Sequence, residues 1–412
     1  MSFRVQPLQT PLIPVLAAMP PPVDASVITL FQAGHGFAAS PGSTGTQGDD
    51  ASTFLLGTQS YRLTTAGAGG FTAARRTGFG PFDATGRMMA MLVRIDNWQS
   101  LSDCRLDIAS DVFVNWSSAD TVSPATNLVS PFYVNGEWLY VTLNWGAFAV
   151  GGGAGVTRNN ITGVQVRCKD DGTGQVVEHV NKVAMIAEPA NGVVTFTFDD
   201  GYAGVWASAK PILDAAGYSA GFGPIVDKIG QTNFMPIDQL YGLRDSGWEP
   251  HPHSFAVAVH NNYSTVSDQT AIADMTAAKA WIRANGFGSG DNLLVPQGQT
   301  INATRYEAFR NMATTCRSAY TRVRETYPPG PPYDLRTYTL SQANTLADVE
   351  LKVDECATNK TWLILQAHNI TATPTSIDWT VADFQSLVTY IQGKGAAIKV
   401  KRITDVVKSG VA

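Results

Sequence analysis

The pattern of apolar and polar residues changes near residue 192. From 31 to 190, short apolar runs are separated by glycine- and serine-rich connections, and no helical periodicity is sustained. These runs predict strands over 52–56, 60–65, 87–95, 138–145, 161–168 and 183–187. Several short strands without helices between them favour an all-β antiparallel sandwich of the jelly-roll kind.

From 191 to 412 the pattern alternates between strand and helix. Helical segments are predicted over 206–216, 236–246 and 267–285, each followed by a glycine, with short apolar strands between them. Such alternation predicts parallel strands in an α/β fold, either open or closed into a barrel. Residues 1–30 are proline-rich and irregular, which predicts an N-terminal arm ahead of the two domains.

One predicted strand ends in two acidic residues. Residues 193–201 read Val-Val-Thr-Phe-Thr-Phe-Asp-Asp-Gly, so an apolar strand runs directly into Asp199 and Asp200. Neighbouring residues on a strand point to opposite faces, so both carboxylates reach one site only where the chain turns, and Gly201 permits that turn. Functional groups of parallel α/β folds gather at these strand ends.

Histidines are concentrated in the same half of the chain. Four of the six histidines lie at or near predicted strand ends there, namely His251, His253, His260 and His368. Imidazole and carboxylate together form a common ligand set for a zinc-like ion. A single histidine at a strand end is more often structural, but four of them beside two aspartates predict a metal site at this edge, with positions open for water and substrate if the site is catalytic.

These residues resemble the motifs of the polysaccharide deacetylases of the NodB-homology type, over about residues 193–407. The family's first motif, Thr-Phe-Asp-Asp-Gly, is intact at 197–201. The resemblance implies a deformed (β/α) barrel that removes acetyl groups from polysaccharides. It also implies that Asp199 is the catalytic base and Asp200 a metal ligand.

The second family motif, His-Ser/Thr-x-x-His, is longer in this chain. His253 and Ser254 match its start, but the position of the second histidine by strict spacing is Val257. The residues after His260 match the run that comes after the second histidine in the family, which implies an insertion and makes His260 the ligand. His251 is the alternative, because it would share a strand face with His253.

The later motifs are present in altered form. Residues 294–298 read Leu-Val-Pro-Gln-Gly where the family has Arg-x-Pro-x-Gly, so the arginine that orients the base is absent. The resemblance implies that the backbone N–H of Gln297 is an oxyanion donor. It also implies that His368, with one extra residue before it, is the general acid. The family's remaining motif of an acidic residue and tryptophan has no clear equivalent.

The resemblance implies a divalent metal cofactor, with zinc expected and cobalt or nickel as alternatives. It implies an acetylated polysaccharide as substrate, such as capsule, exopolysaccharide or peptidoglycan, with N-acetyl and O-acetyl groups both open. The first domain resembles jelly-roll carbohydrate-binding modules, and a purely structural or assembly role is the alternative. For the whole chain, the alternative function is a non-catalytic glycan-binding or virion structural protein on the same scaffold.

Composition and net charge indicate which kinds of binding partner to expect. The net charge of −5 gives no reason to expect nucleic acid, and no apolar segment has the ~20 residues that span a membrane. The N-terminus lacks the pattern of a standard signal peptide, which leads to two hypotheses: a phage tail component that assembles as a symmetric multimer, or an extracellular protein exported by a signal-independent route. The four cysteines, Cys104, Cys168, Cys316 and Cys356, have no metal-type spacing, and disulfide pairing stays open.

Overall fold

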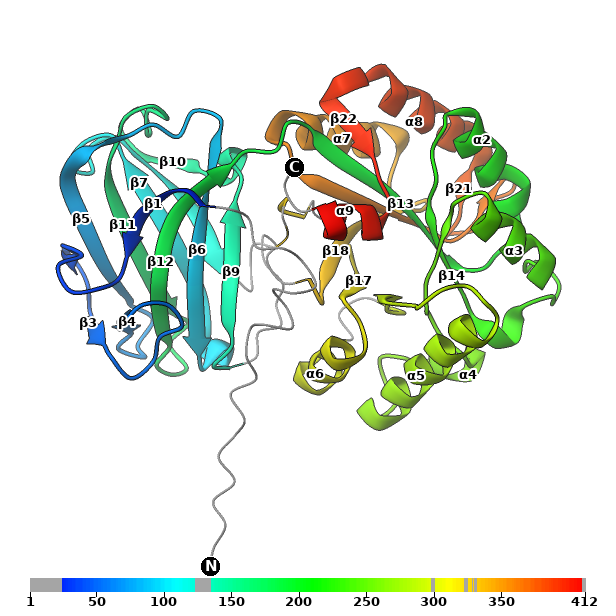
Figure 1. The fold of residues 1–412 in the computed structure, drawn as a ribbon, viewed down its shortest axis with the longest axis horizontal. Helices are drawn as coiled ribbons and strands as arrows, with labels where there is room; N and C mark the ends of the chain where they lie inside the picture. The colour runs from blue at the N-terminus through cyan, green and yellow to red at the C-terminus, as the bar shows by residue number, and fades with distance from the viewer. Residues whose placement is uncertain are drawn as a thin grey trace, which may run out of the picture.

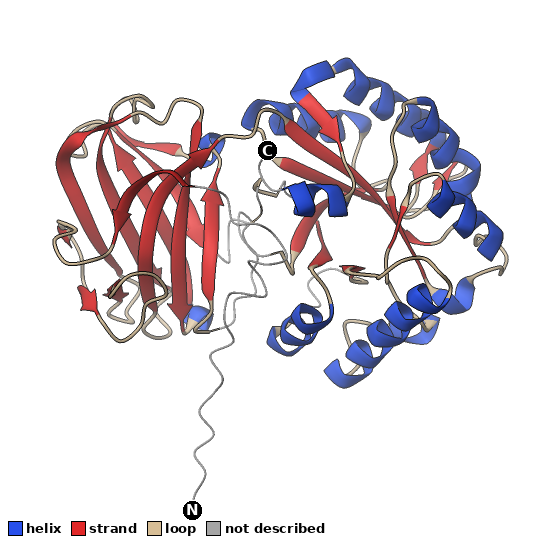
Figure 2. Ribbon diagram, in the orientation of Figure 1, coloured by secondary structure: helices blue, strands red, loops and turns tan. Residues whose placement is uncertain are grey.

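The computed structural model describes residues 24–122, 135–297, 301–321, 325–327, 329 and 332–409. Within these residues the chain forms two domains side by side, a β-sandwich and an α/β domain (Figure 1). Strands fill the first domain, whereas the longer helices belong to the second (Figure 2). Both predicted fold classes are therefore confirmed.

The sandwich consists of two antiparallel sheets. One sheet has the strand order β3-β4-β12-β6-β9, with β1 beside β12, and the other has the order β10-β8-β7-β11-β5-β2. The strands of the first sheet are β1 Asp24–Leu30, β3 Thr46–Asp50, β4 Ser60–Thr64, β6 Arg87–Asp96, β9 Trp138–Leu143 and β12 Val177–Ala187. Those of the second are β2 Ala38–Ala39, β5 Phe71–Phe82, β7 Leu101–Ala109, β8 Trp116–Val122, β10 Ala149–Gly152 and β11 Ile161–Asp170.

The core of the sandwich lies between these sheets. Apolar side chains of both inner faces, such as Met91, Leu106, Val166 and Val183, are fully buried. On β11 buried positions largely alternate with partly exposed ones, as expected for a sheet with one face in the core. Hydrophobic burial is thus the main source of stability in this domain.

Two sequence expectations for this region differ from the structure. Residues 24–30, assigned to the N-terminal arm, form β1 and pair with β12, while 1–23 lie outside the described residues. The predicted strand over 52–56 is a loop, whose Leu55 and Leu56 donate backbone N–H groups to Asn181 Oδ1 at 2.9 and 2.6 Å. A buried side-chain amide therefore replaces strand pairing there.

The second domain is built on a parallel sheet. In the described residues this sheet has eight strands, in the order β15-β14-β13-β19-β18-β17-β16, with β22 also paired to β13. The strands are β13 Gly192–Asp200, β14 Gly221–Pro224, β15 Glu249–Pro250, β16 Asn292–Leu294, β17 Thr315–Thr321, β18 Leu335–Leu340, β19 Trp362–Ala367 and β22 Ile398–Val400. The sheet curves into part of a barrel with helices around its outside (Figure 1).

Helices follow most of these strands. They are α2 Lys210–Ala215, α3 Ile237–Asp245, α4 Val257–His260, α5 Asp268–Ala284, α6 Ala303–Met312, α7 Leu346–Asn359, α8 Val381–Gly393 and α9 Ile403–Ser409. The segment predicted as one helix over 206–216 begins as a π-helical turn, η3 Val205–Ala209, before α2. No helix in the described ranges combines the length and apolar character needed to cross a membrane.

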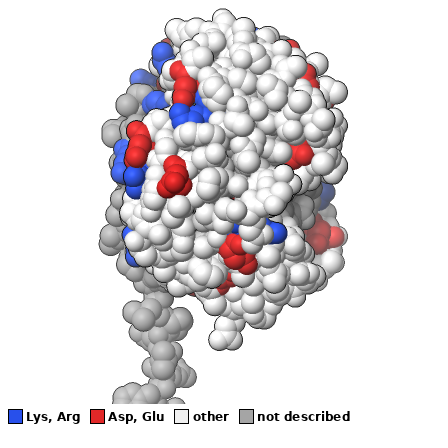
Figure 3. Space-filling model, turned by 90° about the vertical axis from the view of Figure 1, so that its right-hand side faces the viewer, with Lys and Arg blue, Asp and Glu red and all other residues white. Residues whose placement is uncertain are grey.

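The central strand β13 positions the candidate site. All nine of its residues are buried, and it pairs in parallel with β14, β19 and β22. Its carboxyl end, with Asp199 and Asp200, therefore lies among the carboxyl ends of its neighbours. The outer face of this domain carries acidic and basic side chains in small mixed groups (Figure 3).

Candidate metal centre and active site

The chain turns sharply at the end of β13. Asp200 has a φ of 70° and Gly201 a φ of 86°, so two consecutive residues adopt the left-handed conformation. This conformation is uncommon for a residue other than glycine and costs of order 1 kcal/mol. It lets the Asp199 and Asp200 side chains approach one site, whereas a regular strand would send them to opposite faces.

The structure brings together three of the predicted site residues: Asp200, His253 and His260. Asp200 Oδ1 lies 3.1 Å from His253 Nε2 and 3.0 Å from His260 Nε2. The two imidazole nitrogens are 3.2 Å apart. Asp200 and His253 are buried and His260 is 15% exposed, so the cluster has one side open to solvent.

The orientation of His253 suits a metal ligand. Its Nδ1 lies 2.7 Å from the carbonyl oxygen of Leu294, and donating a proton there leaves the Nε2 lone pair directed at Asp200. Such a second hydrogen bond commonly fixes the tautomer of metal-binding histidines.

The three ligand atoms fit a divalent ion. Atoms 2.0–2.1 Å from a tetrahedral zinc ion are about 3.3 Å apart. The observed separations of 3.0 to 3.2 Å are close to that value. Two imidazoles and one carboxylate leave a further coordination position for water or substrate, as in catalytic rather than structural zinc sites.

Electrostatics in this cluster favours an ionised carboxylate. Burial alone would raise the pKa of Asp200, but hydrogen bonds and charge from His253 and His260 hold it far below its usual range. Burial alone would lower the pKa of His260. The Asp200 carboxylate outweighs burial, so the pKa of His260 is raised. The carboxylate is therefore available as a ligand at neutral pH.

The longer second motif forms a turn followed by a short helix. The Asp274 carboxylate accepts hydrogen bonds from Ser254 Oγ at 2.6 Å and from the backbone N–H groups of Phe255 and Ala256 at 3.0 and 2.8 Å. Residues 257–260 then form α4, which brings His260 back to His253. Val257, the position given by strict spacing, is thus at the start of α4 and outside the cluster.

His251, the alternative ligand, lies elsewhere. Its Nδ1 contacts the backbone oxygen of Asn292 at 3.0 Å, two residues before the Leu294 oxygen that His253 contacts. Two residues along a strand span about 6.6 Å, so His251 is one step deeper in the barrel. Its Nε2 faces Gly221, where even a Cβ atom would come within 2.5 Å of it.

Asp199 is held by two side chains that the sequence analysis missed. Arg317 Nη2 donates to its Oδ1 at 2.6 Å, and Gln366 Nε2 donates to its Oδ2 at 2.7 Å. Burial alone would raise the pKa of Asp199. The charge of Arg317, with smaller contributions from His253 and His368, outweighs burial and lowers it.

Arg317 replaces the arginine missing from the third motif. That arginine would stand at position 294, which is Leu294 here, and Leu294 is the register partner of Arg317 across the β16–β17 pair. The guanidinium therefore comes from the adjacent strand at the same level of the sheet. The available sequence signal was an arginine within a short strand of otherwise uncharged residues, since a buried arginine is rare without a partner.

The remaining predicted residues lie at the same edge of the sheet. His368 directly follows β19 and is partly buried, and its Nδ1 has no hydrogen-bond partner among the described residues. Gln297 has a left-handed φ of 54° and precedes the undescribed residues 298–300. Their roles as general acid and backbone oxyanion donor stay predictions.

The Gln297 side chain has a structural role that the sequence analysis missed. Its Nε2 donates to the backbone oxygens of His260 and Asn261 at 3.1 and 3.0 Å. Its Oε1 accepts from the backbone N–H of Ser264 at 3.2 Å. These bonds tie the segment after α4 to the end of the third motif.

Comparison with known proteins agrees with this geometry. Residues 187–315 match the family model for polysaccharide deacetylase. No curated protein matches the chain.

Several solved structures are similar to parts of the chain. A family 4 carbohydrate esterase from Streptomyces lividans has 17% identity and a TM-score of 0.38, with 54% of this chain and 98% of that one covered. A mutant of the peptidoglycan deacetylase PdaC from Bacillus subtilis has 13% identity and a TM-score of 0.35, with 53% and 92% covered. A carbohydrate-binding module of the β-sandwich superfamily has 13% identity and a TM-score of 0.29, with 40% and 61% covered.

The matched segment of the family model contains most of the site described above. Asp199, Asp200, His253, His260 and Gln297 lie within it, whereas His368 lies beyond it. The match to the polysaccharide deacetylase family model at residues 187–315 thus covers the end of β13 and both histidines of the candidate metal centre.

Proposed function

We propose that this chain hydrolyses acetyl groups, as amides or esters, from a polysaccharide, and that a divalent metal ion takes part. The observation that carries the proposal is the convergence of Asp200, His253 and His260 beside the buried Asp199–Arg317 pair. The family whose model this domain matches supports the same reaction class.

The donor set favours zinc. Two imidazoles and one carboxylate at near-tetrahedral spacing would hold it, with cobalt or nickel as chemically similar alternatives. Bound there, the ion would lower the pKa of a water molecule and polarise the acetyl carbonyl.

The protein side chains then have separate tasks. Arg317 and Gln366 orient the Asp199 carboxylate, which accepts the proton of the attacking water. The backbone N–H of Gln297 donates a hydrogen bond to the oxygen that becomes negative. His368 donates a proton to the departing nitrogen or oxygen, so the sugar leaves as a neutral amine or alcohol.

The sandwich domain is proposed to hold the polysaccharide. On the outer face of its second sheet, a groove is lined by Ser40, Pro41, Phe71, Arg75, Phe113, Trp116, Gln165 and Arg167. Aromatic rings beside arginine and glutamine side chains offer both the flat apolar surface and the hydrogen bonds that sugars require. An assembly role for this domain is the alternative.

The proposal is tested by measuring acetate release from two panels of glycans, one that carries N-acetyl groups and one that carries O-acetyl groups. The wild type with zinc added is expected to release acetate, and Asp199→Ala is expected to lose nearly all activity while still binding metal. If the zinc-loaded wild type releases no acetate from any member of either panel but binds one of them, the non-catalytic glycan-binding function is correct instead.

A further inference from the structure

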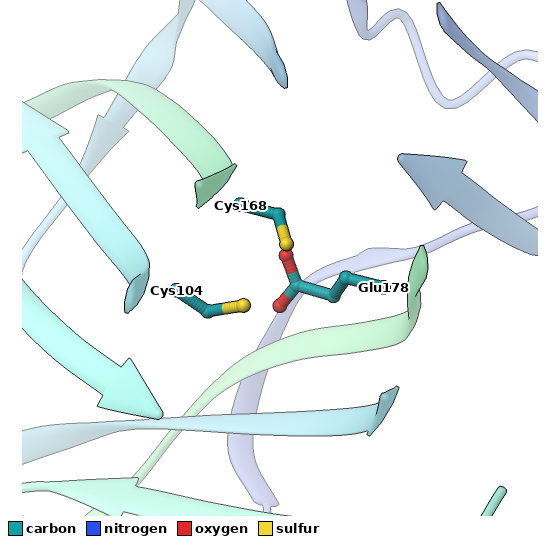
Figure 4. Close-up of side chains that lie close together, drawn as sticks. All are labelled: Cys104, Cys168 and Glu178. Atoms are coloured by element: carbon teal, nitrogen blue, oxygen red, sulfur yellow. The ribbon is translucent and has the colours of Figure 1, made fainter. Parts of the chain in front are cut away.

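A second group of side chains that could bind a metal ion lies inside the sandwich, in the other domain from the site above. Cys104 on β7 and Cys168 on β11 are directly opposite each other in antiparallel register. Glu178 on β12 belongs to the facing sheet and points between them (Figure 4). The potential ligand atoms of the three residues all lie within 4.8 Å of one another.

The environment of Glu178 is unusual for a carboxyl group. All three side chains are fully buried, and apart from the Cys104 thiol, a weak hydrogen-bond donor, no described residue pairs with the Glu178 carboxyl group. Burial raises the pKa of Glu178 to about 8, and it also raises the pKa of both thiols. An apolar side chain would fill this position at lower cost, unless the carboxyl group has a partner.

We propose that Cys104, Cys168 and Glu178 form a closed structural site for a thiophilic divalent ion of the zinc class. Two thiolates select soft or borderline ions. In Figure 4 each carboxyl oxygen faces one sulfur, so both oxygens can bind the same ion and complete four ligands. The two oxygens of one carboxylate lie too close together for a regular tetrahedron, so the coordination would be distorted. With near-tetrahedral angles at the thiolates, a sulfur would lie about 3.5–3.8 Å from the other sulfur or from an oxygen.

Metal binding at such a site is coupled to proton release. Binding one divalent ion releases one proton from each thiol and one from the carboxylic acid, which leaves the site with a net charge of −1. Because the group is fully buried, there is no open position for substrate, and the role is structural.

The ion would cross-link the two sheets. β7 and β11 belong to one sheet, whereas β12 belongs to the other and leads directly to β13 of the barrel. Ligands from separate strands exist together only in the folded domain, so binding stabilises that state.

The experiment uses the full chain, purified and refolded under reducing conditions with zinc. An Asp200→Ala background removes the site in the barrel, so that the remaining metal reports on the sandwich alone. About one zinc ion per chain is expected in this background, and close to none after Cys104→Ser or Cys168→Ser is added. Cys316→Ser is the matched control, because Cys316 is a fully buried free cysteine of the other domain.

Cobalt distinguishes the two sites by their ligands. Thiolate bound to Co²⁺ produces an intense charge-transfer absorption that imidazole and carboxylate do not. This absorption is expected in Asp200→Ala and in its Cys316→Ser derivative. It should be absent when Cys104 is replaced, and cobalt affinity should fall at least about 10-fold in Glu178→Gln, which keeps the side-chain shape.

Two results would overturn this proposal. One is a folded Asp200→Ala protein with both sandwich thiols titratable after denaturation, yet with no bound zinc and no cobalt charge-transfer band. The other is a Cys104–Cys168 disulfide that forms in the zinc-loaded protein. Glu178→Gln serves as the deciding variant if the serine substitutions prevent folding, and neither result depends on deacetylase activity.

Discussion

At the scale of single residues, the Asp199 carboxylate depends on a guanidinium from the adjacent strand. Arg317 is fully buried and its Nη2 lies 2.6 Å from Asp199 Oδ1. Removing one partner of such a buried ion pair costs folding free energy, because the charge that remains is buried without a partner or solvent to stabilise it. Because Leu294 is in register with Arg317, a double substitution can move the positive charge from position 317 to position 294 on the adjacent strand.

Replacing Arg317 should impair catalysis more than substrate binding. Arg317→Leu is expected to lower kcat about 10- to 100-fold with a smaller effect on KM, because Asp199 loses its orientation. Adding Leu294→Arg to that variant should recover a large part of kcat. Steady-state acetate release measures both, and an unchanged kcat in folded Arg317→Leu would refute the assigned role.

The candidate site was predictable only where its residues form local motifs. Asp199 and Asp200 stand at the end of an apolar strand, and His253 and His260 are close in sequence. Arg317 and the other partner of Asp199 are more than 100 residues away in the chain. Their contact is created by strand order and register, which a single sequence does not reveal.

At the scale of elements, the turn before α4 determines the position of His260. Asp274 on α5 accepts three hydrogen bonds from residues 254–256, and Asp227 accepts from the backbone N–H of Val257 at 2.9 Å. The insertion in the second motif is therefore fixed by two carboxylates outside the motif. Gln297 secures the chain on the other side of α4.

Weakening this anchor should lower metal affinity without removing a ligand. Asp274→Asn is expected to reduce zinc affinity about 10-fold. In this variant an NH2 group takes the place of one carboxylate oxygen and faces a backbone N–H, so that hydrogen bond is lost and His260 is held less firmly. Asp245→Asn on the exposed surface of α3 is the control. Equal affinities in a competition titration with a chelating dye would show that the turn does not position His260.

Prediction of the elements succeeded better for the barrel than for the sandwich. The predicted helix over 267–285 matches α5 closely, since Ser267 caps its start and Gly286 follows its end. Strands β5, β7 and β8 were not predicted. Charged residues on their outer face and the Gly and Pro residues of β5 hide the alternation that marks a strand.

At the scale of the whole molecule, ion pairs connect the two domains. Only residues 188–191 separate β12 from β13. Glu188 pairs with Lys360 at 3.0 Å, and Glu137 of the sandwich pairs with Arg310 of α6 at 2.6 Å. A short connection with these contacts limits the relative motion of sandwich and barrel.

The Glu137–Arg310 pair offers a test of this coupling. Both side chains are nearly buried, at 12% and 11% exposure. A double-mutant cycle with Glu137→Gln and Arg310→Met should give a coupling free energy between about 0.5 and 3 kcal/mol in chemical unfolding. Strictly additive effects of the two substitutions would mean that the pair does not hold the domains together.

The groove on the sandwich is expected to affect activity on acetylated polysaccharides but not on small acetylated esters. Trp116→Ala is expected to weaken binding of an acetylated polysaccharide by removing a flat contact surface, and to leave acetate release from a small acetylated ester unchanged. Val150→Ala, an exposed residue outside the groove lining, is the control. Equal loss of activity on both substrates would assign Trp116 to folding rather than to glycan binding.

We propose that a metal ion at Asp200, His253 and His260 is required for acetyl hydrolysis. A zinc titration of chelator-treated wild type, with bound zinc and acetate release measured in the same samples, tests this requirement directly. Activity is expected to be lost on chelation and to rise in proportion to zinc at this site, while Asp200→Ala stays inactive at every zinc concentration. Full activity of the metal-free protein, or an active Asp200→Ala variant, would contradict the claim.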